Sequence, residues 1–264
     1  MIDMTIKLKK INAIFFDLDD TLFPTYHFAE FARRNAIRSM IQFGLKANHD
    51  EAYQKLIEII KETGSNYDKH FNLLSQHFNG KVDAKIVAAG VNAYHNAKNT
   101  IIPFPYTHST LLELKKRNIK LYIATNGNPI KQWDKILRLN IDYYFDEVFI
   151  SEEVGMDKSK SFFKKILNKL KLNPKNCIMI GNSIDVDIIP ALQTNMYAIL
   201  IDHYNKFLKL KERSKKVDTF YYATTNNEEI FEMNLCKKLN KKMKNCSLEF
   251  FIVENLQDIL KLIN

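Results

Sequence analysis

The sequence predicts an α/β fold, in which helices cover a parallel sheet and a further set of helices is inserted after the first strand. Three observations predict it. Short, continuous apolar runs recur along the chain, as is typical of strands buried on both faces. Amphipathic segments with helical spacing separate these runs. Residues 25–102 contain helical patterns but no convincing strand, which indicates a helical insertion.

The first expected strand is the apolar run 13–16, and helical patterns follow at 28–44 and 51–64. Pro103 and Pro105 mark the exit from the insertion. Further apolar runs predict strands at residues 120–125, 147–151, 177–180, 197–201 and 249–253. A helix with one apolar face is predicted from the i, i+3, i+4, i+7 spacing of Phe163, Ile166, Leu167 and Leu170. The polar region 203–247 delays the last strand, and the sequence does not specify its role.

Composition limits the function. The chain has 264 residues, of which 39 are basic and 30 acidic, for a net charge of +9. The lysines are scattered over every segment, which fits solvated helix faces better than a nucleic-acid surface, so we expect no nucleic-acid partner. We expect no membrane partner, because no apolar run approaches the roughly 20 residues that span a bilayer. Three cysteines and no recognisable signal peptide favour the cytoplasm.

Polar side chains follow four of the expected strands. In an open parallel sheet, ligands bind outside the carboxyl ends of the strands. In chain order, these ends carry Asp17, Asp19, Asp20 and Thr21; then Thr125 and Asn126; then Lys158; then Asn182, Asp185 and Asp187. Mg²⁺ prefers oxygen ligands and commonly binds one or two carboxylates together with a substrate phosphate. The sequence therefore predicts a site for Mg²⁺ and a phosphate group at this edge.

These residue types suit phosphate-ester chemistry. An aspartate can attack phosphorus and form an aspartyl-phosphate, which divides a difficult hydrolysis into two easier steps. A second aspartate two residues further on can transfer a proton. Thr125 and Asn126 offer hydrogen-bond donors to phosphate oxygens, and Lys158 supplies a positive charge.

Four motifs, in chain order, resemble those of the haloacid dehalogenase (HAD) superfamily. They are "DLDDT" (the pattern D-x-D-x-T), "ATNG", the lysine of "SEEVGMDKSKSFF" and "IGNSIDVDI". The resemblance implies a Rossmann-like parallel-sheet core formed by residues 1–24 and 103–264, and a helical cap at 25–102. It further implies site roles: Asp17 is the nucleophile, Asp19 the acid/base, and Thr125, Asn126 and Lys158 bind phosphate. The metal would be held by Asp17, Asp19, Asn182 and Asp187.

The fourth motif departs from the family, because Asn182 stands where relatives usually have aspartate. An amide oxygen can still coordinate Mg²⁺, and Asp185 is an alternative ligand. Asp187 matches the second aspartate of the motif, or it could cap a helix that begins near Val186. Within the insertion, "EFARRNAI" and "KETGSNYDKHF" resemble the archaeal subgroup that contains glyceraldehyde 3-phosphate phosphatase.

We therefore expect a Mg²⁺-dependent phosphatase that acts on a small phosphorylated metabolite, such as a sugar phosphate, through an aspartyl-phosphate. A phosphotransferase or mutase is an alternative, and so is a non-enzymatic regulatory protein that accepts a phosphoryl group. Asp19 and the insertion disfavour the regulatory alternative, and Asp19 with Asp187 disfavours a dehalogenase. Asn66 and His70 are candidates either for substrate contact or for helix packing.

Overall fold

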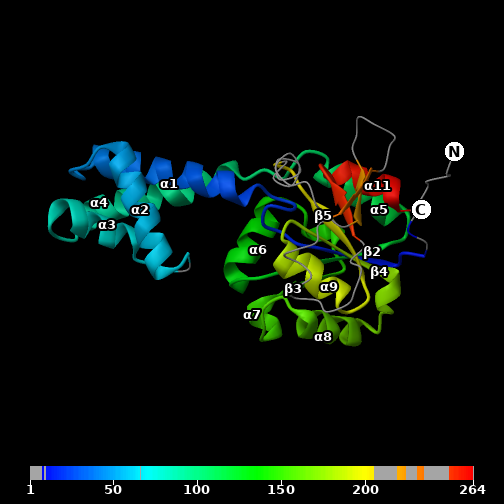
Figure 1. The fold of residues 1–264 in the computed structure, drawn as a ribbon. Helices are drawn as coiled ribbons and strands as arrows, with labels where there is room; N and C mark the ends of the chain where they lie inside the picture. Colours follow the sequence, from blue (N-terminus) through cyan, green and yellow to red (C-terminus); the bar gives the residue numbers. More distant parts are fainter. Residues whose placement is uncertain are drawn as a thin grey trace. The chain divides into compact units, whose positions relative to one another are not determined.

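The computed structural model describes residue 8 and residues 10–65, 67–204, 219–223, 231–234 and 250–263. It divides the chain into two compact units (Figure 1). We call residues 1–24 with 103–264 the core unit, and residues 25–102 the helical unit. In the described part of the chain, no helix has the length and apolar character needed to cross a membrane.

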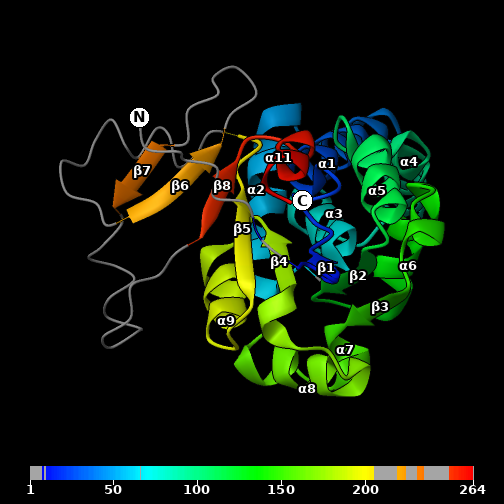
Figure 2. The same cartoon turned by 90° about the vertical axis from the view of Figure 1, so that its right-hand side faces the viewer.

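The six strands predicted from the apolar runs are confirmed, and they run parallel to one another in the sheet. In spatial order they are β3 (Glu147–Ile150), β2 (Lys120–Thr125), β1 (Ala13–Phe16), β4 (Cys177–Gly181), β5 (Tyr197–Ile201) and β8 (Phe251–Val253). Two strands within 203–247 extend the sheet: β6 (Thr219–Ala223) runs parallel to β8, and β7 (Phe231–Asn234) antiparallel to β6 (Figure 2). The rest of that region, from residue 205 on, lies outside the described residues.

The register aligns the carboxyl ends of the three central strands. Phe16, the last residue of β1, pairs with Ile123 of β2 on one side and with Ile180 of β4 on the other. The order of strands along the chain reverses at β1, because β2 lies on one side of it and β4 on the other. Such a reversal opens a crevice beyond the carboxyl ends of the strands, where ligands bind in open α/β sheets. The loop after β1 therefore lies at the switch point of the fold.

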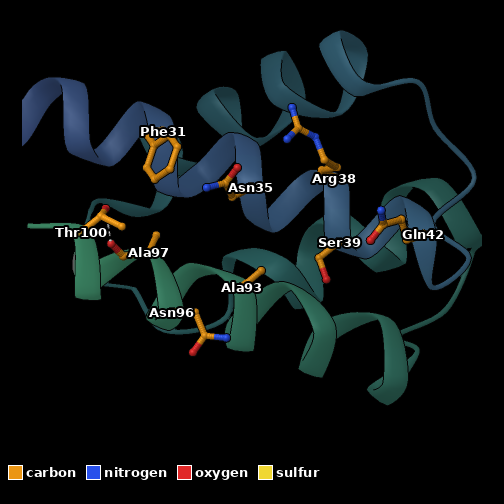
Figure 3. A pocket seen from close by; sticks show the side chains of 9 residues that line it. All are labelled: Phe31, Asn35, Arg38, Ser39, Gln42, Ala93, Asn96, Ala97 and Thr100. Carbon is orange, nitrogen blue, oxygen red and sulfur yellow. Dashed lines mark hydrogen bonds between the residues drawn. The ribbon is translucent and has the colours of Figure 1, made fainter.

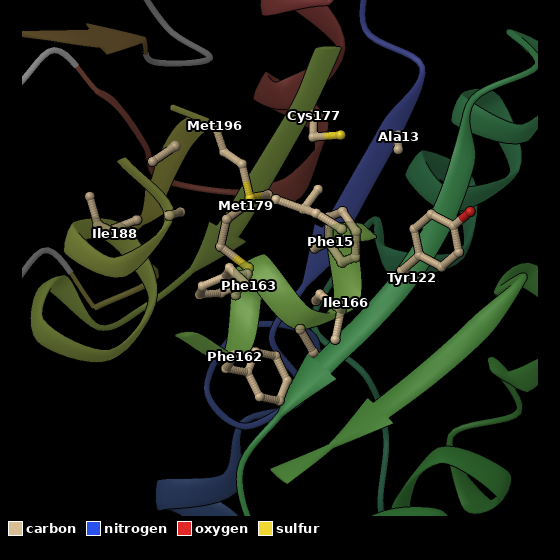
Figure 4. Packing of buried hydrophobic residues seen from close by; sticks show 14 of the residues in the cluster. Ala13, Phe15, Tyr122, Phe162, Phe163, Ile166, Cys177, Met179, Ile188 and Met196 are labelled. Atoms are coloured by element: carbon tan, nitrogen blue, oxygen red, sulfur yellow. The ribbon is translucent and has the colours of Figure 1, made fainter. Parts of the chain in front are cut away.

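Helices cover both faces of this sheet. On one face lie α8 (Lys160–Leu170) and α9 (Ile189–Leu192); on the other lie α5 (Thr107–Lys116) and α11 (Ile259–Leu262) (Figure 2). Alternate strand residues such as Phe15 and Met179 point toward α8, whose Phe163 and Ile166 meet them (Figure 4). The amphipathic helix predicted from that spacing is confirmed. This packing fixes β1 and β4 rigidly, and so fixes the loops that follow them.

The helical unit consists of α1 (Thr25–Gln42), α2 (His49–Thr63), α3 (His70–Asn79), α4 (Ala84–Ala97) and a short 3₁₀ helix, Lys98–Thr100. Side chains of Asn48 and Asp83 cap α2 and α4. A separate apolar core includes Met40, Leu56 and Leu74. A cavity of about 390 Å³ lies between α1 and α4, lined by polar residues such as Arg38 and by Phe31 (Figure 3).

Candidate active site

A tight loop follows β1 and carries the aspartates of the first motif. The backbone N–H of Asp17 donates to the carbonyl of Ile180, which continues the β1–β4 ladder by one residue. Asp20 adopts a left-handed conformation (φ 56°), and its N–H donates to the carbonyl of Phe23 at 2.7 Å. Aspartate tolerates this conformation better than most residues, so Asp20 serves as a turn residue. The loop places Asp17 directly over the end of the central strand.

Three charged side chains converge below this loop. The ammonium of Lys158 lies 2.5 Å from Oδ1 of Asp17 and 2.5 Å from Oδ1 of Asp187. The side chain of Lys158 is only 3% exposed, so it is not a surface lysine. Thr21 donates its hydroxyl to the other oxygen of Asp17 at 3.2 Å. Residues from the first, third and fourth motifs therefore form one buried ionic cluster at the switch point.

The cluster carries one positive and two negative charges, and burial affects each of them. Burial raises the pKa of Asp17 to about 7; the Lys158 ammonium opposes this shift, while the Asp187 carboxylate adds to it. Burial alone would lower the pKa of Lys158, but the two carboxylates outweigh it and hold that pKa above its ordinary value. Lys158 therefore remains charged, and the carboxylate of Asp17 is incompletely compensated.

Because Gly181 has no side chain, the carboxylate of Asp187 can approach the end of β4 and contact Lys158. A Cβ on Gly181, the last residue of β4, would lie 2.3 Å from the carboxylate carbon of Asp187. Asp187 Oδ2 accepts the backbone N–H of Ser183, and the Ser183 side chain caps the following turn by accepting the N–H of Val186. The alternative in which Asp187 is itself the cap is therefore wrong. Asp185 is exposed, whereas Asp187 is buried.

Thr125 and Asn126 lie at the carboxyl end of β2. Asn126 accepts the backbone N–H of Lys158 through its Oδ1 at 2.8 Å, which positions the lysine loop. Thr125 is buried, and its hydroxyl accepts the side-chain amide of Gln132 at 3.0 Å. Their predicted contact with phosphate stays a prediction. In the helical unit, the His70 ring lies 3.0 Å from Thr63 Oγ1, and Asn66 lies outside the described residues.

Asp19 contacts two residues that the sequence did not single out. Lys135 and Gln132, both on α6 (Pro129–Arg138), approach its carboxylate. Gln132 is 3% exposed and shares the inner face of α6 with Ile136. A polar residue at an apolar-face position, four residues from an isoleucine, was the one signal that could have identified it. Lys135 looked like any other lysine of this basic chain.

The donor set fits a magnesium ion. Among the described residues, no three acidic, histidine or cysteine side chains gather closely enough to form a metal cluster by themselves. Mg²⁺ needs only one or two carboxylates, since water and phosphate oxygens complete its octahedral shell. Asp17 and Asp187 supply two buried carboxylates, which Lys158 alone neutralises only in part. Asn182, a predicted ligand, follows Gly181 and is partly buried.

Known proteins share this arrangement of motifs. A family model described as haloacid dehalogenase-like hydrolase matches residues 11–193, which include all four motifs. The chain belongs to the haloacid dehalogenase-like hydrolase family. The match starts two residues before β1 and ends just after α9, so the family signature excludes β5 and everything that follows it.

Curated relatives are named phosphatases. The chain is 43% identical to the glyceraldehyde 3-phosphate phosphatase of Methanothermobacter thermautotrophicus, over 73% of this chain and 86% of the relative. It is 42% identical to the enzyme of that name from Methanocaldococcus jannaschii, over 82% and 93%. Among solved structures, a HAD-hydrolase of Bacillus subtilis bound to magnesium has the same fold (TM-score 0.57, 16% identity, 97% of this chain and 100% of the other).

A histidine that follows β5 contacts the loop that carries the aspartates. His203, which follows β5, lies with Nε2 at 2.9 Å from the carbonyl of Thr21 and stacks on Phe104 with ring centroids 3.6 Å apart. Burial lowers the pKa of His203, against the opposing effect of two nearby backbone carbonyls. The folded protein therefore favours the neutral imidazole.

We expect Gly181→Ala to weaken binding of Mg²⁺ about tenfold or more, because the added Cβ must displace the Asp187 carboxylate; changes beside metal ligands commonly cost that much. Calorimetric titration of the protein with MgCl₂ alone measures this without turnover. Gly80→Ala is the control, since a Cβ there meets nothing within 4 Å, although φ is +72°. Equal magnesium affinity in the Gly181→Ala variant and the original protein would contradict the assignment of Asp187.

We expect His203 to make stability depend on pH. Its folded pKa lies below the unfolded value of about 6.5, so the unfolded state binds more protons, and the free energy of unfolding falls as pH drops below that value. Urea denaturation at pH 7.5 and 5.5 should show a smaller loss for His203→Gln than for the original protein. His77→Gln, at an exposed position on α3, should keep the original loss. Equal losses in all three proteins would refute the effect.

Proposed function

We propose that this protein is a Mg²⁺-dependent phosphatase that hydrolyses a small phosphorylated metabolite through an aspartyl-phosphate on Asp17, with glyceraldehyde 3-phosphate as the leading substrate. One observation carries the proposal: Asp17 lies at the end of the central strand, buried against Lys158 and beside Asp187. A buried carboxylate held by a lysine at a switch point is suited to attack on a charged group. Sequence identity of 42–43% to glyceraldehyde 3-phosphate phosphatases supports the choice of substrate.

In the first step, an oxygen of Asp17 forms a bond to phosphorus while the bond from phosphorus to the ester oxygen breaks. Lys158 and Thr21 hold the two oxygens of Asp17, so the attacking carboxylate is oriented before substrate arrives. Asp19 gives its proton to the departing alkoxide. The products of this step are the alcohol and the phosphorylated Asp17.

In the second step, Asp19 removes a proton from water, and the resulting hydroxide attacks the phosphorus of phosphorylated Asp17. Inorganic phosphate leaves, and Asp17 and the protonated Asp19 are regenerated. In the free protein, two carboxylates raise the pKa of Lys158 against the effect of burial, so Lys158 is charged when the first step begins. After Asp17 is phosphorylated, Asp187 and the phosphoryl oxygens supply the negative charge beside the ammonium. The Lys158 ammonium can therefore attract phosphate oxygens in both steps.

A bound Mg²⁺ supplies a positive charge that attracts and polarises the phosphoryl oxygens. Asp17 and Asp187 are its proposed side-chain ligands, with Asn182 and Asp19 as further oxygen donors from the same two loops. Thr125 and Asn126 are proposed to bind phosphate beside Lys158, and residues 25–102 to act as the cap. We place the enzyme in the cytoplasm, where small phosphorylated metabolites occur.

The proposal is tested by measuring phosphate release from glyceraldehyde 3-phosphate with Mg²⁺ and with EDTA. We expect turnover only with the metal, and none in Asp17→Asn, because an amide cannot attack phosphorus. Mass spectrometry of the protein quenched during turnover should find one phosphoryl group on the peptide that contains Asp17. Full activity in EDTA, or wild-type activity of Asp17→Asn, would refute the mechanism.

A further inference from the structure

The carboxylate of Asp19 is held by one helix. Lys135 on α6 places its ammonium 2.6 Å from Oδ1 and 2.8 Å from Oδ2 of Asp19. Gln132, one turn earlier on the same helix, donates its side-chain amide to Oδ2 at 3.1 Å. Residues at i and i+3 lie on the same side of a helix, so both side chains reach the carboxylate together. Both oxygens of Asp19 are therefore engaged by α6.

Gln132 also joins Asp19 to the end of β2. The same amide nitrogen lies 3.0 Å from the hydroxyl of Thr125 and 2.5 Å from the carbonyl of Asn126. The side-chain carbonyl of Gln132 is buried and has no hydrogen-bond partner among the described residues. Such an unsatisfied group is unfavourable. The contacts of the Gln132 amide connect the proton-transfer residue Asp19 to the proposed phosphate-binding residues at the end of β2.

Asp19 needs such support because of its own loop. It precedes Asp20, which has a left-handed backbone, and its side chain is 32% exposed. A partly exposed aspartate on a turn can adopt several side-chain orientations. Proton transfer to a leaving group requires approach to hydrogen-bond distance, and a small misplacement slows such a step strongly. The contacts of α6 restrict these orientations.

A contribution to stability alone does not account for the contact between Lys135 and Asp19. The side chain of Lys135 is 22% exposed, and ion pairs with this degree of solvent access contribute little to stability. The Lys135 ammonium nevertheless bonds both oxygens of the carboxyl group to which the proposed mechanism assigns proton transfer.

We propose that Lys135, assisted by Gln132, is a positioning residue that holds the Asp19 side chain in one orientation, so that its carboxyl group, once protonated, faces the oxygen of the leaving group. The inference rests on the proposed phosphatase function and extends it to two residues of α6. It concerns the first chemical step, in which the ester bond breaks.

The test uses leaving groups of different basicity. The value of kcat/KM includes formation of phosphorylated Asp17, so its dependence on the leaving group reports proton donation in that step. An alkoxide such as that of glyceraldehyde 3-phosphate needs a proton in order to depart, whereas p-nitrophenolate needs little help. For Lys135→Met we expect kcat/KM to fall about 10- to 100-fold for the alkyl ester, at most the roughly 10²-fold lower limit of what general acid catalysis contributes, but less than about threefold for the aryl ester. KM should change little.

Two further variants complete the series. Lys135→Arg, which keeps the charge, should recover part of the activity toward the alkyl ester. Lys164→Met removes an exposed lysine from the interior of α8 and should leave both esters unaffected. Combining Lys135→Met with Asp19→Asn should cost little more than Asp19→Asn alone, because Lys135 acts through Asp19.

The results for the two esters and the double variant either support or overturn the positioning role of Lys135. Equal losses for both esters in Lys135→Met, or full additivity with Asp19→Asn, would overturn the positioning role while leaving the phosphatase function intact. A wild-type protein that hydrolyses neither ester with Mg²⁺ would overturn the proposed function, and the positioning role with it. Selective loss for the alkyl ester, together with non-additivity, is the expected result.

Discussion

The two ion pairs of Lys158 are the interaction on which the rest of the candidate site depends. A single buried ammonium brings together Asp17, which directly follows β1, and Asp187, which lies 170 residues later in the short helix after the adjacent strand β4. Without that ammonium, two buried carboxylates would repel each other, and an unpaired buried charge is strongly unfavourable. Removing one charged partner lowers the stability of the folded protein by more than the ion pair itself contributes, because the remaining buried charge is left unpaired. The site is therefore held together by the same charges that give it reactivity.

The parallel sheet explains why these charges can meet at all. Because β1 lies between β2 and β4 with their carboxyl ends aligned, three loops open at one edge. The apolar cluster around Phe15 and Met179 fixes the strands beneath them. Supports from more distant elements then fix the side chains: Asn126 orients the lysine loop, and His203 secures the aspartate loop. The rigid sheet therefore fixes where the three loops lie, and hydrogen bonds from neighbouring elements fix how the side chains of these loops are oriented.

Much of this could be predicted from the sequence, for physical reasons. Strands buried on both faces leave continuous apolar runs, and Asp17, Lys158 and Asp187 were identified because they follow such runs. Contacts between side chains could not be predicted in the same way. Periodicity cannot tell Lys135 from other lysines, and it gave no sign that Asn126 accepts a backbone N–H of the lysine loop. Such partners depend on distances across the fold, which local patterns do not encode.

The position of β1 in the sequence also bears on folding during synthesis. The central strand emerges first during synthesis, yet one neighbour, β2, follows about a hundred residues later and the other, β4, later still. Until then the segment "AIFF" has no partner, and a short apolar strand without a partner promotes aggregation. Charged residues flank it in the sequence, with "KK" at 9–10 and the aspartates from Asp17 on. Such residues act as gatekeepers against self-association. The proposed nucleophile and its neighbours therefore also occupy positions at which charged residues are expected to oppose self-association of the unpaired strand.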